Sequence, residues 1–287
     1  MQLDNEGWII RRRGDDEVHA LRRHVRPIAL ERTRHQLVEI VATCRFGKAL
    51  LLDGVYQSSE FDQLLKHEVL VHPVMSLACG TPTDVLVVGG GEGCVVREVL
   101  RHTSVRSVVM VELDDRVPAL CETHLGWDEG ALRDPKVTVY FGDAAAVLPN
   151  LPKSLKFDVI IVDSTQPAQG SLAGSLAEAN FLSELRRRLR KNGFVAGYGI
   201  NAAPIARVLR TKIRERIQRT FGGTLVEYVV PCPFYSASFA FQLCTASQIS
   251  DLGGLVLERF AELALTGPRA LDAVSMRSYL AIPWGYR

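Results

Sequence analysis

The chain has 287 residues, of which 47% are hydrophobic and 23% are charged, as is typical of a globular protein with a large core. Its net charge of +2 and its pI near 8.2 are too mild to indicate a nucleic-acid partner. Its start is polar and no long apolar run follows, so we expect no membrane segment and a cytoplasmic location.

The six cysteines are scattered along the sequence, with no CxxC pair and no His/Cys cluster at metal-ligand spacing. This pattern predicts reduced, mostly buried thiols in a cytosolic protein. We therefore expect no structural metal.

Residues 1 to about 60 are predicted to form antiparallel β-structure, with turn signals at Gly14-Asp15 and Asp53-Gly54 between extended runs. Eight arginines between positions 11 and 34 could bind an anion or RNA. No aromatic residues are interleaved with them to stack bases. We favour the alternative that these charges protect exposed strand edges.

A helical pattern follows over residues 61 to 79 and ends at Gly80 and Pro82. This places a domain boundary near residue 80. We expect a β domain with a bridging helix over 1–79 and a second domain over 80–287.

Residues 84 to 112 predict a strand, a glycine turn, a helix and a second strand. The apolar run over 85–88 is typical of a strand buried on both faces, and Gly89, Gly90, Gly91 and Gly93 follow it. The second strand ends in Glu112, which can accept hydrogen bonds from ribose hydroxyls. Because glycines let backbone N–H groups approach a ligand closely, this unit predicts a nucleoside-cofactor site.

Helices and strands continue to alternate after Glu112, and acidic residues stand at the ends of successive strands. The strand over 136–141 leads into Asp143, and the strand over 157–163 ends in Asp163. Open α/β sheets bind ligands at this edge, so we expect the three acids beside the glycine turn. A helix is predicted from Asn180 to a C-cap at Gly193. Two last strands are predicted as an antiparallel hairpin, over 223–231 and 236–246.

At this point the sequence resembles the spermidine synthase (polyamine aminopropyltransferase) family over nearly its whole length. The matching stretches are LLLDGVYQSSEFD, VLVVGGGEGCVVREVLRH, VVMVELDDRV, DPKVTVYFGDA, FDVIIVDSTQP and SASFAFQLCT. The resemblance implies a Rossmann-like class I methyltransferase fold after a small antiparallel β domain. It also implies an adenosyl-sulfonium cosubstrate, a small-molecule acceptor, and a homodimer or homotetramer.

The nucleoside half of the family's site is retained. The resemblance implies that Gln57 and the loop Gly89–Gly93 hold the cosubstrate, with Glu92 facing the amine of its side chain. Glu112 matches the ribose-binding acid. Asp143, followed by Ala144, matches the residue that hydrogen-bonds the adenine amino group, and Asp163 opens the family's gatekeeping loop.

The acceptor half departs from the family. Gln166 stands where the motif D-S-S-D-P has its second Asp, the residue assigned to deprotonating the attacking amine. Lys66-His67-Glu68 replaces the family's Tyr-X-Glu, and Tyr198-Gly199-Ile200 replaces its Gln-Gly-Glu. Polyamine sites need carboxylates to offset desolvation of ammonium groups, and Lys66 would repel a cation.

These departures favour complete S-adenosylmethionine, whose carboxylate Lys66 could pair with, over its decarboxylated form. We expect most simply a methyltransferase with a small, non-polyamine acceptor. Such an enzyme would use Gln166 and Asp163 at the reacting centre, His67 as a base, and Tyr198, Tyr235 and Phe239 as an aromatic wall. One alternative is a polyamine aminopropyltransferase that uses decarboxylated S-adenosylmethionine. A second alternative is a non-catalytic regulatory paralogue.

Overall fold

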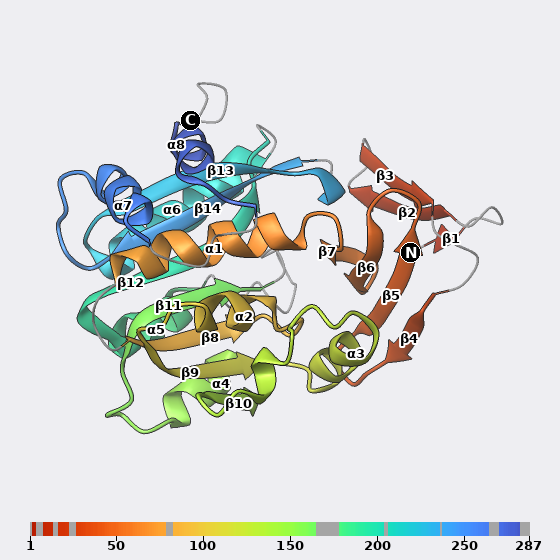
Figure 1. Cartoon of the computed structure of the whole chain (residues 1–287), viewed down its shortest axis with the longest axis horizontal. Helices are drawn as coiled ribbons and strands as arrows, with labels where there is room; N and C mark the ends of the chain where they lie inside the picture. The colour runs from red at the N-terminus through yellow and green to blue at the C-terminus, as the bar shows by residue number, and fades with distance from the viewer. Residues whose placement is uncertain are drawn as a thin grey trace.

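The computed structural model describes residues 2–3, 8–13, 17–22, 27–78, 83–164, 178–203, 206–235, 237–263 and 270–281. Within residues 2–22, and at Tyr198, it describes the backbone alone. The strands form three sheets, and helices pack on both faces of the largest (Figure 1).

The largest sheet has seven strands in the order β10-β9-β8-β11-β12-β14-β13. Its first five strands are parallel, whereas β14 and β13 are antiparallel and close one edge as the predicted hairpin. The predicted α/β fold with a mostly parallel sheet is confirmed. The strands are β8 (Thr83–Gly89), β9 (Val105–Glu112), β10 (Val137–Phe141), β11 (Phe157–Asp163), β12 (Leu189–Asn201), β13 (Leu225–Cys232) and β14 (Ala237–Thr245).

The N-terminal part is antiparallel, as predicted, and consists of two smaller sheets in the orders β1-β2-β3 and β4-β5-β6-β7. The turn predicted at Gly14-Asp15 falls outside the described residues. The strands are β1 (Gln2–Leu3), β2 (Trp8–Arg13), β3 (Glu17–Arg22), β4 (Ala29–Arg32), β5 (Leu37–Thr43), β6 (Gly47–Leu52) and β7 (Val55–Ser59).

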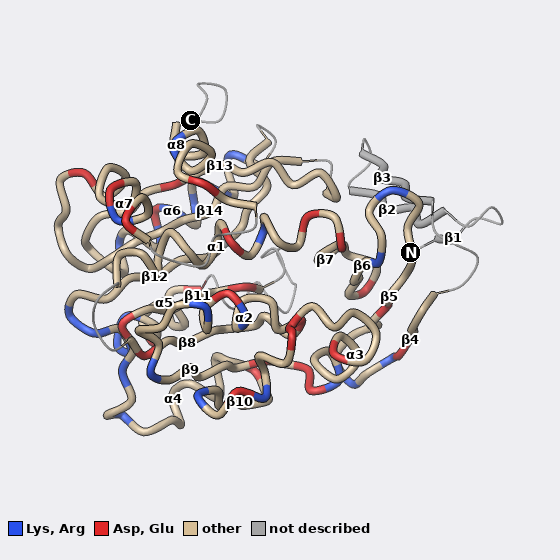
Figure 2. The backbone as a smooth tube through the Cα atoms, viewed as in Figure 1, with Lys and Arg blue, Asp and Glu red and all other residues tan. Residues whose placement is uncertain are grey.

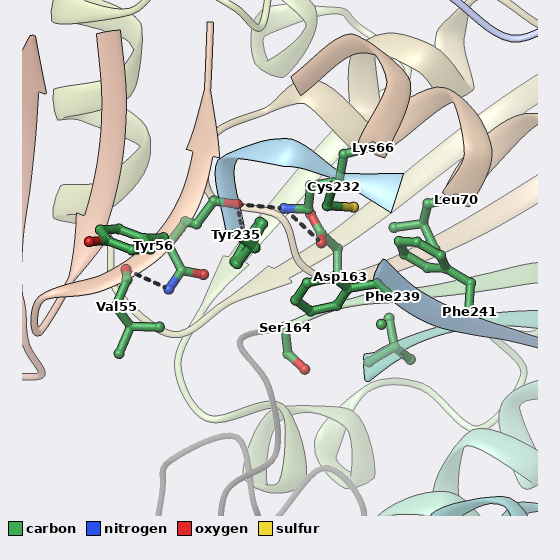
Figure 3. Close-up of a pocket in the computed structure, with 13 residues that line it drawn as sticks. Val55, Tyr56, Lys66, Leu70, Asp163, Ser164, Cys232, Tyr235, Phe239 and Phe241 are labelled. Carbon is green, nitrogen blue, oxygen red and sulfur yellow. Dashed lines mark hydrogen bonds and ion pairs between the residues drawn. The ribbon is translucent and has the colours of Figure 1, made fainter. Parts of the chain in front are cut away.

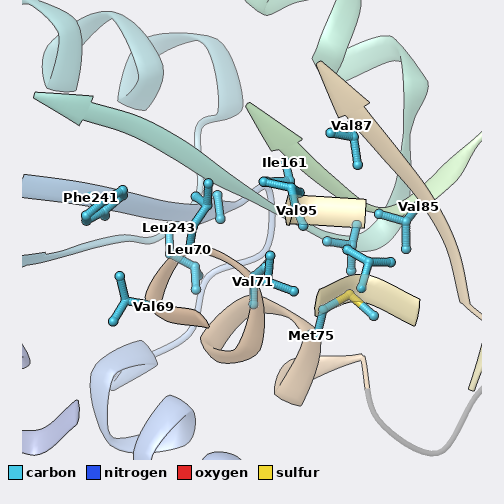
Figure 4. Packing of buried hydrophobic residues seen from close by; sticks show 14 of the residues in the cluster. Val69, Leu70, Val71, Met75, Val85, Val87, Val95, Ile161, Phe241 and Leu243 are labelled. Carbon is cyan, nitrogen blue, oxygen red and sulfur yellow. The ribbon is translucent and has the colours of Figure 1, made fainter. Parts of the chain in front are cut away.

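Side chains along β8 point alternately to the two faces of the sheet, which explains why the core has two main layers. Val85 and Val87 belong to a cluster with α1, α2, α7 and α8, part of which is drawn in Figure 4. Leu86 and Val88 point to the other face and belong to a cluster with α4, α5 and α6. The helices are α1 (Gln63–Leu77), α2 (Cys94–Leu100), α3 (Arg116–His124), α4 (Ala144–Asn150), α5 (Ala179–Arg188), α6 (Arg207–Phe221), α7 (Leu252–Ala261) and α8 (Ala273–Leu280).

The predicted end of the helix before β12 was wrong. Helix α5 ends at Arg188 and not at Gly193, which lies within β12. The guanidinium of Arg188 is buried and donates hydrogen bonds to the carbonyl oxygens of residues 148, 151, 152 and 155. Tertiary contacts that the helical pattern does not encode therefore stop the helix early.

Lysines and arginines are interspersed with acidic residues along the described chain (Figure 2). In the part of the chain that the structure describes, no helix is both long and apolar enough to span a bilayer.

Candidate active site

The sheet brings the glycine turn and two of the strand-end acids together. Strand β8 lies between β9 and β11, so Glu112 and Asp163 end on either side of the turn that follows Gly89. The backbone N–H of Gly90 donates to the carbonyl oxygen of Asp163 at 3.0 Å. A Cβ on Gly91 would lie 3.1 Å from Oε2 of Glu112. The predicted juxtaposition at the carboxyl edge of the sheet is thus present for Glu112 and Asp163.

Two positions in the turn require glycine. Gly89 has φ +80°, and a Cβ there would lie 2.2 Å from the carbonyl oxygen of Asp163. Gly93 has φ +77°, and a Cβ there would lie 2.4 Å from Cβ of Asp128. Both the left-handed backbone and the close approach exclude a side chain. The turn is therefore held tightly against β11, and helix α2 begins directly after it.

Glu112 is a buried carboxyl group at the end of β9. Its Oε1 accepts a hydrogen bond from the backbone N–H of Asp114 at 3.1 Å. Burial raises the pKa of Glu112 to about 7, although hydrogen bonds from the N–H groups of Asp114 and Leu113 oppose this shift. A ligand that donates hydrogen bonds, such as a ribose diol, would stabilise the ionised form.

Glu92 lies within the glycine turn and is also buried. Its Oε1 accepts a hydrogen bond from Ser58 Oγ at 2.7 Å and lies 3.4 Å from Lys66 Nζ. Its Oε2 has no hydrogen-bond partner among the described residues. Burial alone would raise the pKa of Glu92, but the charges of Lys66 and His67 lower it below its usual range. This buried oxygen is therefore an acceptor without a donor in the described part of this structure.

Lys66 points into the site from the first turns of α1 (Figure 3). Besides Glu92, its Nζ lies 3.2 Å from the carbonyl oxygen of Gln57, 3.3 Å from Ser58 Oγ and 3.7 Å from Asp163 Oδ1. Burial would lower the pKa of Lys66, but the carboxylates of Asp163 and Glu92 raise it well above its usual value. Lys66 is therefore a permanent ammonium ion inside the site.

His67 is fully buried behind the site and touches both acids. Its Nδ1 lies 2.5 Å from the carbonyl oxygen of Gln63, and its Nε2 lies 2.8 Å from Glu92 Oε1 and 3.8 Å from Asp163 Oδ2. His67 is absent from the residues that line the cavity described next. It can orient the two carboxylates, and its role as a base stays a prediction.

A cavity opens beside Lys66 and Asp163 (Figure 3). Asp163 is the one carboxylate among the described residues that line it. Most of the other lining side chains are apolar or aromatic. The lining residues are Val55, Tyr56, Gln57, Lys66, Leu70, Val162, Asp163, Ser164, Gly199, Cys232, Tyr235, Phe239 and Phe241.

The aromatic wall of the cavity consists of Tyr235, Phe239 and Phe241. The rings of Tyr235 and Phe239 are tilted by 59° with 4.7 Å between their centroids, and the Tyr235 hydroxyl donates a hydrogen bond to the carbonyl oxygen of Gln57. The sequence hypothesis included the first two residues but missed Phe241. It lies two residues after Phe239 on β14 and hence on the same face, a signal that strand periodicity contained. Ser58 was also missed, and nothing in the local pattern distinguishes it.

The remaining predicted residues lie in different places. Gln57 lines the cavity, but its side-chain amide donates to the carbonyl of Val55 at 3.1 Å. Asp143 is the N-cap of α4, where its Oδ1 accepts from the N–H of Ala145, and buried Ala144 follows it. Tyr198 is in β12 with its side chain outside the described part, and Gln166 lies outside the described residues altogether.

Two groups of potential metal ligands occur near α1. One contains His67, Glu92 and Cys94, and the other contains Glu68, His72 and Glu98. Lys66 pairs with Glu92, and Arg97 and Arg101 pair with Glu98. The carboxylates of Glu92 and Glu98 therefore already have counterions.

Comparisons with known proteins identify the family. The family model of the spermine/spermidine synthase domain matches residues 63–250, and that of the spermidine synthase tetramerisation domain matches residues 30–60. A solved structure of spermidine synthase in complex with the transition-state analogue AdoDATO covers 98% of this chain, and the match spans 94% of that structure's chain, with a TM-score of 0.85 and 22% identity. Another, spermidine synthase from Thermotoga maritima, has a TM-score of 0.81 at 21% identity, with 98% and 93% of the two chains covered. At such identity these structures show the fold alone, and this fold is the one expected from the sequence.

Two curated relatives carry the comparison further. Polyamine aminopropyltransferase 2 from Pseudomonas aeruginosa is 41% identical over 240 residues, which span 80% of this chain and 64% of that relative. The polyamine aminopropyltransferase from Aeropyrum pernix is 31% identical over 271 residues, which span 92% of this chain and 85% of that relative. With the synthase domain matched over most of the sequence, the chain belongs to the spermine/spermidine synthase family.

Proposed function

We propose that this protein transfers an aminopropyl group from decarboxylated S-adenosylmethionine to an amine acceptor. The observation that carries the proposal is the match to the spermine/spermidine synthase domain over residues 63–250. The names of the relatives from Pseudomonas aeruginosa and Aeropyrum pernix point to the same reaction. Family membership therefore favours the alternative considered from the sequence, and methyl transfer to a non-polyamine acceptor receives no support from the comparisons.

The strand-end residues suit the donor. Glu112 would accept hydrogen bonds from the ribose hydroxyls, and Asp143 with Ala144 would receive the adenine. The free Oε2 of Glu92 would accept a hydrogen bond from the amine of the aminopropyl chain. The glycine turn would allow the donor to lie directly against the backbone.

Asp163 would assist the transfer. An acceptor nitrogen would attack the carbon bonded to the sulfonium sulfur, and the carbon–sulfur bond would break. The sulfur would leave as the neutral thioether of 5′-methylthioadenosine, while the nitrogen would lose a proton. Asp163 is the described carboxylate that lines the cavity, so we assign it the role of proton acceptor.

We further propose that Gln166 does not act as a base, since an amide cannot take up a proton at neutral pH. This residue stands where the family's motif has a second Asp. Replacing Gln166→Asp would test the assignment. If Asp163 suffices, the substitution should change turnover by less than a few-fold. A gain of a hundredfold or more would show instead that the native chain lacks a base.

In the decisive experiment, the protein is incubated with each donor and a panel of amines. The 5′-methylthioadenosine formed is then measured by mass spectrometry. Decarboxylated S-adenosylmethionine should yield this product together with an aminopropylated amine. If instead complete S-adenosylmethionine gave S-adenosylhomocysteine and a methylated acceptor, the proposal would be wrong. Failure of both donors to bind would leave the non-catalytic paralogue as the explanation.

One observation favours complete S-adenosylmethionine as a second candidate donor. The Lys66 ammonium lies in the cavity, where it could pair with the donor carboxylate that decarboxylation removes. Calorimetry with both donors separates the two candidates. Preference for the complete donor, together with loss of that preference in Lys66→Gln, would support the second candidate.

A further inference from the structure

The carboxylates near the cavity already face basic side chains of the protein itself. His67 Nδ1 must carry a hydrogen, because it lies 2.5 Å from a carbonyl oxygen, which can only accept. Its Nε2 lies 2.8 Å from Glu92 Oε1, so the imidazole ring faces this carboxylate.

Lys66 and Asp163 form an ion pair. Lys66 Nζ has three hydrogens and four oxygen atoms around it, from Gln57, Ser58, Glu92 and Asp163. Asp163 thus faces a protein ammonium before any acceptor arrives. In the region that the structure describes, one acceptor amine can approach Asp163 by giving up its proton, but no second carboxylate lines the cavity.

The cavity walls beyond Asp163 suit an acceptor with an apolar body. Leu70, Phe239 and Phe241 line this part of the cavity. An aromatic face attracts a cation more weakly than a carboxylate does. Removing an ammonium ion from water without a carboxylate partner is costly, so the aromatic wall alone would not hold a second ammonium.

We propose that the acceptor is an amine with a single positive charge on an apolar body, and that Lys66 is the residue that disfavours a second ammonium. This inference rests on the proposed aminopropyl transfer and specifies its acceptor. The charge of Lys66, its position in the cavity and the apolar far wall all act in the same direction.

The test compares two amines of equal length, butylamine and 1,4-diaminobutane, which differ by one ammonium group. Calorimetry would measure the binding of each to the full-length protein saturated with 5′-methylthioadenosine. In the wild type, butylamine should bind about tenfold more tightly or better, which corresponds to one uncompensated charge. Lys66→Gln should improve diamine binding relative to butylamine by about tenfold, whereas Lys66→Arg should keep the wild-type ratio.

Lys48 provides the matched control. Its Nζ donates to the carbonyl oxygen of His124 at 2.7 Å, and it is not among the cavity residues. Lys48→Gln should leave the ratio of the two affinities unchanged.

Several outcomes would overturn the inference. It fails if the wild type binds the diamine more tightly, if neither amine binds, or if Lys66→Gln leaves the ratio unchanged. The wild-type ratio alone decides the matter if the variants do not fold. A protein that binds the amines in the expected order but never forms 5′-methylthioadenosine from either donor would contradict the proposed function instead.

Discussion

Glu112 shows at the scale of one residue how burial prepares a group for its ligand. Its side chain is buried at the end of β9, where backbone N–H groups are the hydrogen-bond donors that lower its pKa. Lys66, by contrast, is held among oxygen atoms of β7, the glycine turn and β11. The Glu112 carboxyl group still needs hydrogen-bond donors, whereas the Lys66 ammonium already has its acceptors.

The raised pKa of Glu112 predicts how nucleoside binding depends on pH. Below pH 7 the carboxyl group is mostly protonated, and a ribose diol prefers the ionised form. The affinity for 5′-methylthioadenosine should therefore rise with pH and be about tenfold higher at pH 8 than at pH 6. Calorimetry across this range would check it. Glu112→Gln should bind more weakly at pH 8 and show a flat profile, and a flat wild-type profile would contradict the prediction.

Replacing Asp163→Asn should separate chemistry from binding. The amide keeps the shape of the side chain but cannot accept the acceptor's proton, so kcat should fall by about 10²–10⁴-fold. Donor affinity should change only a few-fold. Asp143→Asn should show the opposite split, with weaker donor binding and a nearly unchanged kcat. Steady-state kinetics with both variants would reveal an error in either assignment.

At the scale of elements, the close contact between the glycine turn and β11 positions the site. Gly89→Ala would force a methyl group against the carbonyl of Asp163 and would also strain a left-handed backbone. We expect a loss of about 3 kcal/mol or more in the free energy of unfolding, and loss of nucleoside binding.

Gly126 offers the matched control for this substitution. It has φ +67°, but no atom lies within 4 Å of the position that a methyl group would take there, so Gly126→Ala should cost only about 1 kcal/mol. Chemical denaturation of both variants gives the comparison. Equal losses would show that backbone strain, and not the contact with Asp163, dominates.

The end of α5 depends on Arg188, which is buried and ion-paired with Glu184 at 2.8 Å. Arg188→Leu would leave Glu184 without this partner and free the carbonyl oxygens that the guanidinium binds. The free energy of unfolding should fall by about 3–5 kcal/mol. Arg219→Leu, which removes an exposed pair with Glu215, should change it by less than about 0.5 kcal/mol. A small effect at Arg188 would contradict this account of the helix end.

At the scale of the whole molecule, the four-stranded sheet β4–β7 matches the tetramerisation domain. Exposed apolar side chains occur at Ile28 and Leu30, with 40% and 58% of their surface accessible. Such residues at an exposed strand are typical of a surface that another subunit covers.

We therefore predict a homo-oligomer that Leu30→Glu weakens. Sedimentation analysis should show an assembly larger than one chain in the wild type and a shift toward the monomer in the variant. Val274→Glu provides the control, since Val274 is even more exposed but lies on α8. A monomeric wild type, or equal effects of the two substitutions, would refute the prediction.

The sequence by itself determined the order of the elements up to the final hairpin, the glycine turn and the strand-end acids. These features depend on periodicity and on backbone conformation, which are local properties. A parallel arrangement then necessarily places Glu112 and Asp163 at one edge. The family also followed from the sequence, because its motifs lie within continuous segments.

Only the tertiary structure decided which charged side chains lie next to one another. Lys66, His67, Glu92 and Asp163 come from three separate segments, and no local pattern states that they meet. From the sequence, Lys66 favoured a donor carboxylate, whereas in the structure protein oxygens already surround its ammonium. Packing of distant segments also ended α5 at Arg188. Charge and packing across such distances depend on the folded arrangement, which is why local patterns alone do not predict them.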